Sequence, residues 1–417
     1  MIVPASFEVR DQRTRILVLT SSFPSREFPS TCRFVAEWVT SLSQFADVTV
    51  LAPPGAALPD DLSASGVQLH CFAHLPENWK PRLRADTDLR RMLETKPAAW
   101  VEFLPFHREF YHQALCLAAQ TDVVCSHWLV PSAVIGHAVS RKRNLPHVMI
   151  EHSGGLRLLN QVPGGVSLLK RMIDRSASCI TVSQELKTRL VERLPQGAEK
   201  IIVLPMGVAD DALTAREWSK AELRAALGLP DSKLVLFFLG RHVEIKGLPV
   251  VLKALEHQPD VHLIVAGDGP CRTQWEHEAL RRGVAATFLG EVSGAEKWRW
   301  LAAADVMVLP SLEFKGGRTE GTPVVCLEAL TVGTPVMAAA VGGIPEHIQT
   351  GINGWLLPAG DVAAWRAQIN RLATDRAHLE NVSRVTRSQP APHVWSHRGK
   401  EFAEMIGIPF RNGTPVS

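Results

Sequence analysis

Residues 233–247 read KLVLFFLGRHVEIKG and contain, in order, an apolar run, a glycine turn and two cations. The apolar part, 233–241, has the length of a buried strand, and a helix is expected from Leu248 to His257. A short apolar run followed by a longer amphipathic segment is typical of a strand and its crossover helix in a parallel sheet. This stretch therefore predicts an α/β fold.

The same alternation runs along most of the chain. Further strands are expected at 15–20, 47–53, 66–72, 121–127, 147–152, 178–183, 200–205, 261–269, 286–292, 305–310 and 334–340. Helices are expected at 34–45, 86–120, 131–143, 167–176, 184–193 and 323–332, within 361–383, and at 393–407. Glycines 351, 354 and 360 are interpreted as turns.

The length of 417 residues exceeds that of a typical single domain, so two domains are expected. Prolines and glycines concentrate in residues 205–230, which predicts an interdomain hinge there. We expect an N-terminal Rossmann-like domain over 1–205 and a C-terminal Rossmann-like domain over 206–390. The two doubly wound sheets are expected to face each other across a cleft, with a final helix in 391–417 packing back toward the N-terminal domain.

Composition narrows the class of protein. Hydrophobic residues make up 46% and charged residues 21%, which is typical of a globular chain. The net charge of +3 is too small to indicate nucleic-acid binding. No apolar run reaches the length of a membrane span, and Ile16–Leu19 is shorter than the apolar core of a signal peptide. The expected location is the cytoplasm, with peripheral contact at the inner face of the membrane as an option.

Several common sites are not indicated. The seven cysteines form no C-x-x-C pair and are expected to be free thiols in a reducing compartment, so neither a structural zinc nor any other metal site is predicted. The loop 20–30 after the first strand contains no glycine, which disfavours a nicotinamide or flavin cofactor. The motifs GxxxxGK[ST] and GxSxG are missing, which disfavours phosphate-loop nucleotide hydrolysis and serine-hydrolase chemistry. No cofactor is expected.

The turn 240–247 is the first candidate binding loop. Glycine lets a backbone approach a phosphate, the start of the next helix offers free N–H groups, and Arg241 and Lys246 supply positive charge. In open parallel sheets, ligands bind on the loops that follow the carboxyl ends of the strands. The alternative interpretation is an ordinary strand-end turn with exposed cations.

Two carboxylates in residues 320–328 are the second candidate. If a helix begins near Pro323, Glu320 precedes its N-terminus and Glu328 lies inside it. The residues between them are mostly apolar, which ties both carboxylates to a buried helix start. Carboxylates accept hydrogen bonds from paired O–H donors and therefore suit sugar hydroxyls. The alternative is a helix-start charge together with a surface glutamate.

These motifs resemble glycosyltransferase family 4, the retaining GT-B sugar transferases, over residues 15–385. Within the second half, 320–361 is the longest matching segment, EGTPVVCLEALTVGTPVMAAAVGGIPEHIQTGINGWLLPAGD, and it holds the family's pair of glutamates. Other matching segments are LGRHVEIKG (239–247), LIVAGDGP (263–270), TFLGEV (287–292), ADVMVLPS (304–311), FVAEWVTSL (34–42), SHWLVPS (126–132), IEHSGG (150–155), ITVSQELK (180–187) and VLPMGV (203–208).

The resemblance implies a role for each matching residue. Arg241 and Lys246 would bind the donor diphosphate, and Glu328 would hold the nucleotide ribose. Glu320 and His152 would lie beside the transferred sugar, on the C-terminal and N-terminal domains respectively. Backbone amides of the intervening loop would face the sugar and phosphates, at Gly321, Thr322 and Val324. His127 also follows a strand, but the resemblance assigns it no role.

Three positions depart from the family pattern. The first loop, which carries glycine in family members, reads Ser30-Thr31-Cys32-Arg33, and Arg33 is a candidate for phosphate or acceptor contact. Met206 replaces an asparagine in the linker, and Pro323 replaces a second glycine and removes one N–H from the donor loop.

The resemblance implies transfer of a sugar, of the hexosyl type, from UDP- or GDP-sugar to an acceptor hydroxyl with retention of configuration. The acceptor would be a glycan, a lipid-linked glycan or a small molecule, as in polysaccharide or glycoconjugate biosynthesis. No metal is required, because the cations neutralise the departing diphosphate. A nucleoside-diphosphate-sugar 2-epimerase and a non-catalytic GT-B partner protein remain alternatives.

Basic segments of the first half provide a possible contact with anionic lipid. They lie at Arg82–Arg91, Arg141–Arg143 and Lys170–Arg175, with Trp79 and Leu168–Leu169 nearby. Ordinary solvated helix faces are the alternative interpretation.

Overall fold

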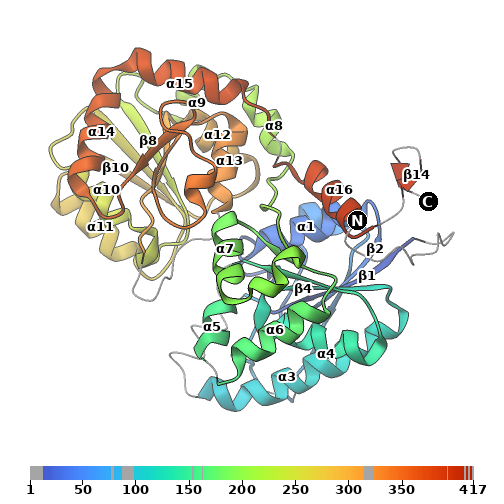
Figure 1. The fold of residues 1–417 in the computed structure, drawn as a ribbon. Helices are drawn as coiled ribbons and strands as arrows, with labels where there is room; N and C mark the ends of the chain where they lie inside the picture. The colour runs from blue at the N-terminus through green and yellow to red at the C-terminus, as the bar shows by residue number, and fades with distance from the viewer. Residues whose placement is uncertain are drawn as a thin grey trace. The chain divides into compact units, whose positions relative to one another are not determined.

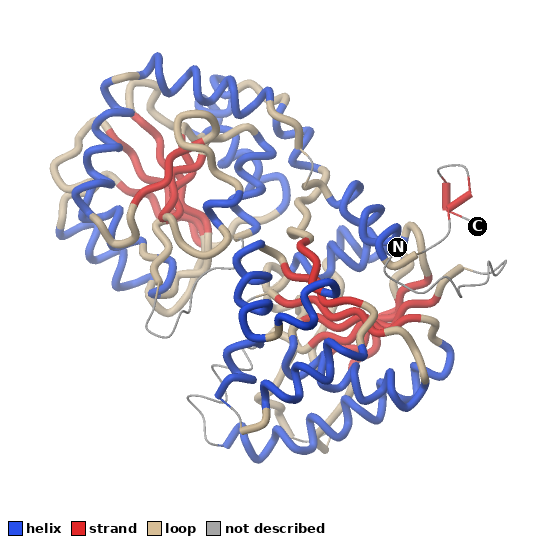
Figure 2. Tube along the Cα trace, in the orientation of Figure 1, coloured by secondary structure: helices blue, strands red, loops and turns tan. Residues whose placement is uncertain are grey.

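The computed structural model describes residues 13–76, 79–86, 98–152, 155–161, 163–313, 323–391, 393–407, 410–411 and 414–415. The chain forms two units, one made of residues 1–207 and 395–417, the other of residues 208–394 (Figure 1). Each unit has its own parallel sheet with helices on both sides, as Figure 2 shows. The α/β fold expected from the apolar runs is confirmed, with two Rossmann-like domains.

The first unit is built on a seven-stranded parallel sheet in the order β3-β2-β1-β4-β5-β6-β7. The strands are β1 (Arg15–Thr20), β2 (Asp47–Ala52), β3 (Gln68–Cys71), β4 (Val123–His127), β5 (His147–Glu151), β6 (Ser178–Thr181) and β7 (Ile201–Val203). The helices are α1 (Arg33–Ser43), α3 (Ala98–Leu117), α4 (Val134–Arg143), α5 (Gly155–Gln161), α6 (Gly165–Arg175), α7 (Gln184–Arg193) and α16 (Trp395–Met405). A short antiparallel pair, β14 (Phe410–Arg411) and β15 (Thr414–Pro415), follows α16.

The second unit is built on a six-stranded parallel sheet in the order β10-β9-β8-β11-β12-β13. The strands are β8 (Leu234–Leu239), β9 (Val261–Ala266), β10 (Ala286–Gly290), β11 (Val306–Leu309), β12 (Val336–Ala339) and β13 (Gly354–Leu357). The helices are α8 (Asp211–Arg216), α9 (Lys220–Leu227), α10 (Leu248–Ala254), α11 (Arg272–Arg281), α12 (Gly294–Ala303), α13 (Val324–Val332), α14 (Val362–Thr374) and α15 (Arg376–Ser388).

The C-terminal helix α16 packs on α1 of the first unit. The indole Nε1 of Trp395 donates to the Glu37 carboxylate at 2.9 Å, and the rings of Phe402 and Trp38 meet edge to face with centroids 4.7 Å apart. Close approach of the two helices requires Gly399, since a Cβ there would lie 2.7 Å from the Ser41 hydroxyl. Residues at the far end of the sequence therefore complete the N-terminal core.

The boundary between the units lies inside the segment 205–230, where an interdomain hinge is expected, but most of that segment is helical. The boundary between the units falls at residues 207–208, and the residues after it form α8 and α9. Ala212 and Ala215 are buried in the core of the second unit, and Arg224 is 7% exposed. Apolar residues on one face of each short helix, rather than the flanking prolines and glycines, decide the structure of this segment.

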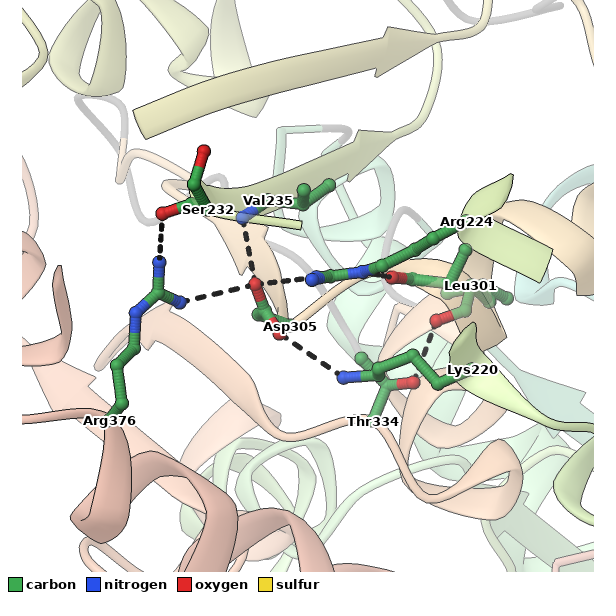
Figure 3. A network of polar contacts seen from close by, with 9 residues as sticks. Lys220, Arg224, Ser232, Val235, Leu301, Asp305, Thr334 and Arg376 are labelled. Carbon is green, nitrogen blue, oxygen red and sulfur yellow. Dashed lines mark hydrogen bonds and ion pairs between the residues drawn. The ribbon is translucent and has the colours of Figure 1, made fainter. Parts of the chain in front are cut away.

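A buried charge cluster ties α9 to the sheet of the second unit (Figure 3). The Asp305 carboxylate lies 2.6 Å from the guanidinium of Arg224, 3.3 Å from the ammonium of Lys220 and 3.5 Å from Arg376, and it accepts the backbone N–H of Val235 at 2.9 Å. Burial alone would raise the pKa of the Asp305 carboxyl, but the two nearest cations and the backbone donor outweigh burial and lower it. Asp305 is therefore charged in the folded protein.

Candidate functional site

Both candidate sites lie where the strand order of a sheet reverses. In the first unit the reversal falls between β1 and β4, whose last residues, Thr20 and His127, are register partners. In the second unit it falls between β8 and β11, and the loop carrying Arg241 and Lys246 leaves the end of β8. Loops diverge to opposite faces of a sheet at such a point, which leaves room for a ligand.

His152 follows directly on β5, and its ring is joined to that of His127. The distance from His127 Nδ1 to His152 Nε2 is 2.9 Å, and the ring planes are 8° apart with centroids separated by 5.1 Å. His127 is fully buried and His152 is half-buried. Burial lowers the pKa of both imidazoles, His127 well below its ordinary value and His152 to about 3, so both rings are neutral at pH 7.

Aromatic side chains surround the two histidines. The ring centroids of Phe34 and Trp128 lie 5.0 and 4.9 Å from that of His152, and Trp38 meets His127 edge to face at 4.7 Å. Trp128 has φ 68°, a backbone conformation that is energetically unfavourable for a residue with a bulky side chain. The backbone N–H of Trp128 donates to the Ile150 carbonyl at 2.8 Å, which helps to hold this conformation.

Glu151 anchors the segments on either side of the histidine pair. Its carboxylate is completely buried and accepts the backbone N–H of Leu129 at 3.0 Å and that of Gly155 at 2.8 Å. Leu129 follows the loop after β4, and Gly155 begins α5. One carboxylate therefore fixes the chain beyond His127 and the chain beyond His152. No local pattern in the sequence marks Glu151 as a site residue.

Replacement of Glu151 by glutamine is expected to lower the free energy of unfolding by about 1–3 kcal/mol, because an amide nitrogen would face one of two buried N–H donors. Urea denaturation measures this loss. The matched control is Glu192→Gln at an exposed position on α7, where a change within about 0.5 kcal/mol is expected. Equal stability of the two variants would contradict the anchoring role.

The loop after β8 is braced by backbone contacts on both sides. His242 N donates to Asp268 O at 2.7 Å, and Leu312 N, beyond β11, donates to Ile245 O at 2.8 Å. Arg241 is exposed, whereas Lys246 is partly buried with its side chain passing near Gly240. A Cβ at Gly240 would lie 3.6 Å from the Lys246 Cε. The loop thus holds two cations at the carboxyl end of β8.

Glycine is required at two positions around this loop. Gly247 has φ 66°, and a Cβ there would lie 1.9 Å from the Pro310 carbonyl oxygen. Gly267 has φ 112°, and a Cβ at this position would lie 2.1 Å from the Gly240 carbonyl oxygen. Neither gap admits a side chain, and both backbones are left-handed, so the glycines allow the loops after β8, β9 and β11 to pack together.

Glu328 lies inside α13, whose first residue is Val324 with Pro323 directly before it, as the proline predicts. The Glu328 carboxylate is 8% exposed, and its Oε1 accepts a hydrogen bond from the ammonium of Lys297 on α12 at 2.7 Å. Lys297 in turn lies 3.9 Å from the Trp298 ring centroid. The alternative interpretation of Glu328 as a surface glutamate is therefore wrong. Its partner Lys297 has no local signal in the sequence.

Three of the predicted donor-site residues, Glu320, Gly321 and Thr322, lie outside the described residues. Arg33 does not offer a free cation, since it pairs with Glu37 at 2.9 Å and with Asp61. Within the described ranges there is no cluster of three or more His, Cys, Asp or Glu side chains that could hold a metal ion.

The basic segments proposed for lipid contact are partly paired. Lys170 forms an ion pair with Asp174 at 2.8 Å, and Arg143 donates to the Leu115 carbonyl. The first segment continues beyond Asp86 outside the described residues. Among the helices described, none combines the length and the apolar content needed to cross a bilayer.

Two family models match the chain. The model for group 1 glycosyl transferases matches residues 219–389, and the model for glycosyltransferase family 4 matches residues 33–212. The first covers nearly all of the second unit, including Arg241, Lys246 and Glu328. The second covers most of the first unit, including His127 and His152.

Curated relatives and solved structures match over most of the chain. The chain is 27% identical over 399 residues to a D-inositol 3-phosphate glycosyltransferase of Stackebrandtia nassauensis, covering 90% of this chain and 84% of the relative. It is 26% identical over 340 residues to a putative teichuronic acid biosynthesis glycosyltransferase of Bacillus subtilis, covering 79% and 82%. Its fold matches HepE of Anabaena in complex with UDP (TM-score 0.73, 19% identity, 94% and 99% covered). Sucrose-phosphate synthase of Thermosynechococcus elongatus matches similarly (TM-score 0.74, 19% identity, 94% and 98% covered).

Proposed function

Because this chain belongs to the group 1, family 4 glycosyltransferases and has their GT-B fold, we propose that it transfers a sugar from a nucleoside diphosphate sugar to an acceptor hydroxyl. The observation that carries this proposal is the braced loop that presents Arg241 and Lys246 at the switch point of the second sheet. Two cations on a rigid loop can stabilise the negative charge that a departing diphosphate gains.

UDP is the nucleotide we propose, with GDP as the alternative. The structural neighbour HepE was solved with UDP and with UDP-glucose, which supports UDP as a donor nucleotide. We propose a hexose as the transferred sugar. By their names, one relative is a D-inositol 3-phosphate glycosyltransferase and the other a putative glycosyltransferase of teichuronic acid biosynthesis, which supports an acceptor in glycoconjugate or polysaccharide biosynthesis. We propose that the reaction takes place in the cytoplasm.

The proposed mechanism retains the anomeric configuration. Arg241 and Lys246 bind the diphosphate, Glu328 binds the ribose hydroxyls, and Glu320 and His152 contact the transferred sugar. The amides of Gly321, Thr322 and Val324 would complete the donor site. In this scheme the acceptor attacks on the side from which the diphosphate leaves, and a phosphate oxygen takes the acceptor's proton. The loop cations supply the charge stabilisation that a metal ion would otherwise provide.

Calorimetric titration with UDP, GDP and ADP tests the donor site. Replacement of Glu328 by glutamine is expected to weaken binding of the preferred nucleotide by about tenfold, because a charged hydrogen bond contributes about 1.5 kcal/mol. The affinity for the corresponding nucleoside should fall by the same factor, since the contact is to ribose. Glutamine is preferred to alanine because it keeps a partner for Lys297.

Glu380→Gln, at an exposed position on α15, is the matched control and should leave affinity unchanged. If none of the three nucleotides binds, the transferase proposal fails and a non-catalytic role is favoured. If the donor binds and is converted to the 2-epimer of the nucleotide sugar without an acceptor, the epimerase alternative replaces transfer.

A further inference from the structure

The ring of His152 has a hydrogen-bond partner to which the family resemblance assigns no role. His127 reaches it from the end of the neighbouring strand, with 2.9 Å between Nδ1 of His127 and Nε2 of His152. The ring planes are 8° apart, and the centroid distance of 5.1 Å is nearly the largest that a 2.9 Å contact between two ring nitrogens allows. The hydrogen bond therefore runs in the plane of both rings, along the direction of an N–H bond and a lone pair. This geometry is favourable, but it leaves open which ring donates.

The surroundings of His127 decide the direction of the hydrogen bond. Both rings are neutral, so each carries a single N–H, and one ring must donate while the other accepts. His127 Nε2 is buried and has no hydrogen-bond partner among the described residues. If His152 donated, the proton of His127 would have to sit on this unpartnered nitrogen. A buried N–H without an acceptor is rarer in proteins than a buried acceptor without a donor, so His127 is the donor.

The tautomer of His152 follows. Its Nε2 accepts the hydrogen bond from His127, so its single proton lies on Nδ1. We propose that His127 is a positioning residue that fixes His152 as the Nδ1-protonated tautomer and thereby presents an N–H donor to an oxygen atom of the bound sugar. This inference rests on the proposed contact between His152 and the donor sugar. It adds which nitrogen of the His152 ring carries the proton and therefore donates the hydrogen bond to the sugar.

The rest of the site restrains the pair in this arrangement. Trp38 and the loop at Trp128 close around His127, and Glu151 holds the backbone beyond both histidines. The ring of His152 is therefore restrained by packing as well as by the hydrogen bond. His127 has no exposed surface, whereas His152 is partly exposed and can therefore contact a ligand.

Nitrogen-15 NMR of the full chain labelled at histidine tests the tautomer directly. The His152 signals are identified by their loss in His152→Asn. In the wild-type protein we expect a protonated Nδ1 and an unprotonated Nε2 for His152. In His127→Phe, which keeps a ring but removes the donor, we expect His152 to change to the Nε2-protonated form that free histidine prefers. A wild-type His152 already protonated at Nε2 would overturn the proposal.

Kinetics with UDP-glucose as the donor probe separate positioning from structure. In His127→Phe, the rate of UDP release should fall about 10- to 100-fold, whereas the UDP dissociation constant should change less than threefold. His127→Asn places an amide N–H near the position of Nδ1 and should restore a large part of the rate and the His152 tautomer. Equal rates in the phenylalanine variant and the wild type, or no rescue by asparagine, would refute the role.

His147→Gln is the matched control. His147 lies at the opposite end of β5, is buried, and bonds to the Ser126 hydroxyl at 2.9 Å. Its replacement should lower stability without altering the His152 tautomer or the rate per folded molecule. UDP binding and the His152 tautomer together separate this inference from the proposed function. Failure of UDP to bind any variant or the wild type would defeat the donor proposal, whereas normal UDP binding with an unchanged tautomer in His127→Phe would defeat only the role of His127.

Discussion

Alanine in place of Arg241 is expected to lower the turnover of UDP-glucose about 100- to 1,000-fold, which corresponds to about 3 kcal/mol of lost transition-state stabilisation. The reason is that the cation acts on charge that develops as the diphosphate departs. Lys246→Ala is expected to have an effect of similar size. The rate of UDP release at saturating donor measures both.

Binding data identify the group that Arg241 contacts. UDP affinity should fall about tenfold or more in Arg241→Ala, while uridine affinity stays unchanged, because only UDP carries the diphosphate. In Glu328→Gln, by contrast, the affinities for UDP and for uridine are both expected to fall. Lys253→Ala removes an exposed cation on α10 of the same unit and serves as the charge-matched control. Equal loss of UDP and uridine affinity in Arg241→Ala would point to a general disturbance of the fold.

Removal of the Asp305 carboxylate is expected to destabilise the second unit by about 3–5 kcal/mol, because the buried Arg224 and the half-buried Lys220 would lose their counter-charge. The backbone N–H of Val235 would lose its acceptor as well. Hydrogen exchange of β8 and β11 in Asp305→Ala measures the loss within the unit. Glu276→Ala, which breaks a partly exposed pair with Arg272, should cost less than about 1 kcal/mol.

The same cluster gives the second unit a defined acid sensitivity. The pKa of Asp305 is lower in the folded chain than its ordinary value of 3.8. The carboxylate therefore stabilises the fold fully above that ordinary value, and the stabilisation is lost as the pH falls through the lower folded-state pKa. The stability difference between the wild type and Asp305→Asn should narrow only below about pH 4. A difference that narrows between pH 5 and 7 would contradict this assignment.

The apolar runs were sufficient to predict the strands of both sheets, with one exception. Strands β1, β8 and β9 begin within one residue of their expected starts, because a buried parallel strand needs apolar side chains on both faces. The exception is β13, where Gly354 was interpreted as a turn. A Cβ at Gly354 would lie 2.0 Å from the Val336 carbonyl oxygen, so this glycine serves close strand packing. A glycine next to a short apolar run can mark either a turn or a closely packed strand, and the sequence alone does not distinguish the two.

The individual site residues could be predicted only where they belong to a local sequence pattern. Arg241 and Lys246 follow a strand within a few residues of a glycine, and Pro323 marks the start of α13. The partners of these residues have no local signal. His127 meets His152 across 25 residues, and Lys297 meets Glu328 across 31. Such pairs depend on which strands and helices become neighbours, and that is a property of the tertiary fold.

The return of α16 to the first unit makes the second unit an inserted domain in the topological sense. The chain leaves the first unit after Gly207 and re-enters it at Trp395. The two ends of the insert are adjacent, since Val208 N donates to His393 O at 2.7 Å and Val208 pairs with Val394. Residues 208–394 therefore form a continuous insert with neighbouring ends, whereas the first unit is built from two segments that lie far apart in the sequence. A gene that encodes residues 1–207 alone omits the Trp395 and Phe402 rings that cover Glu37 and Trp38.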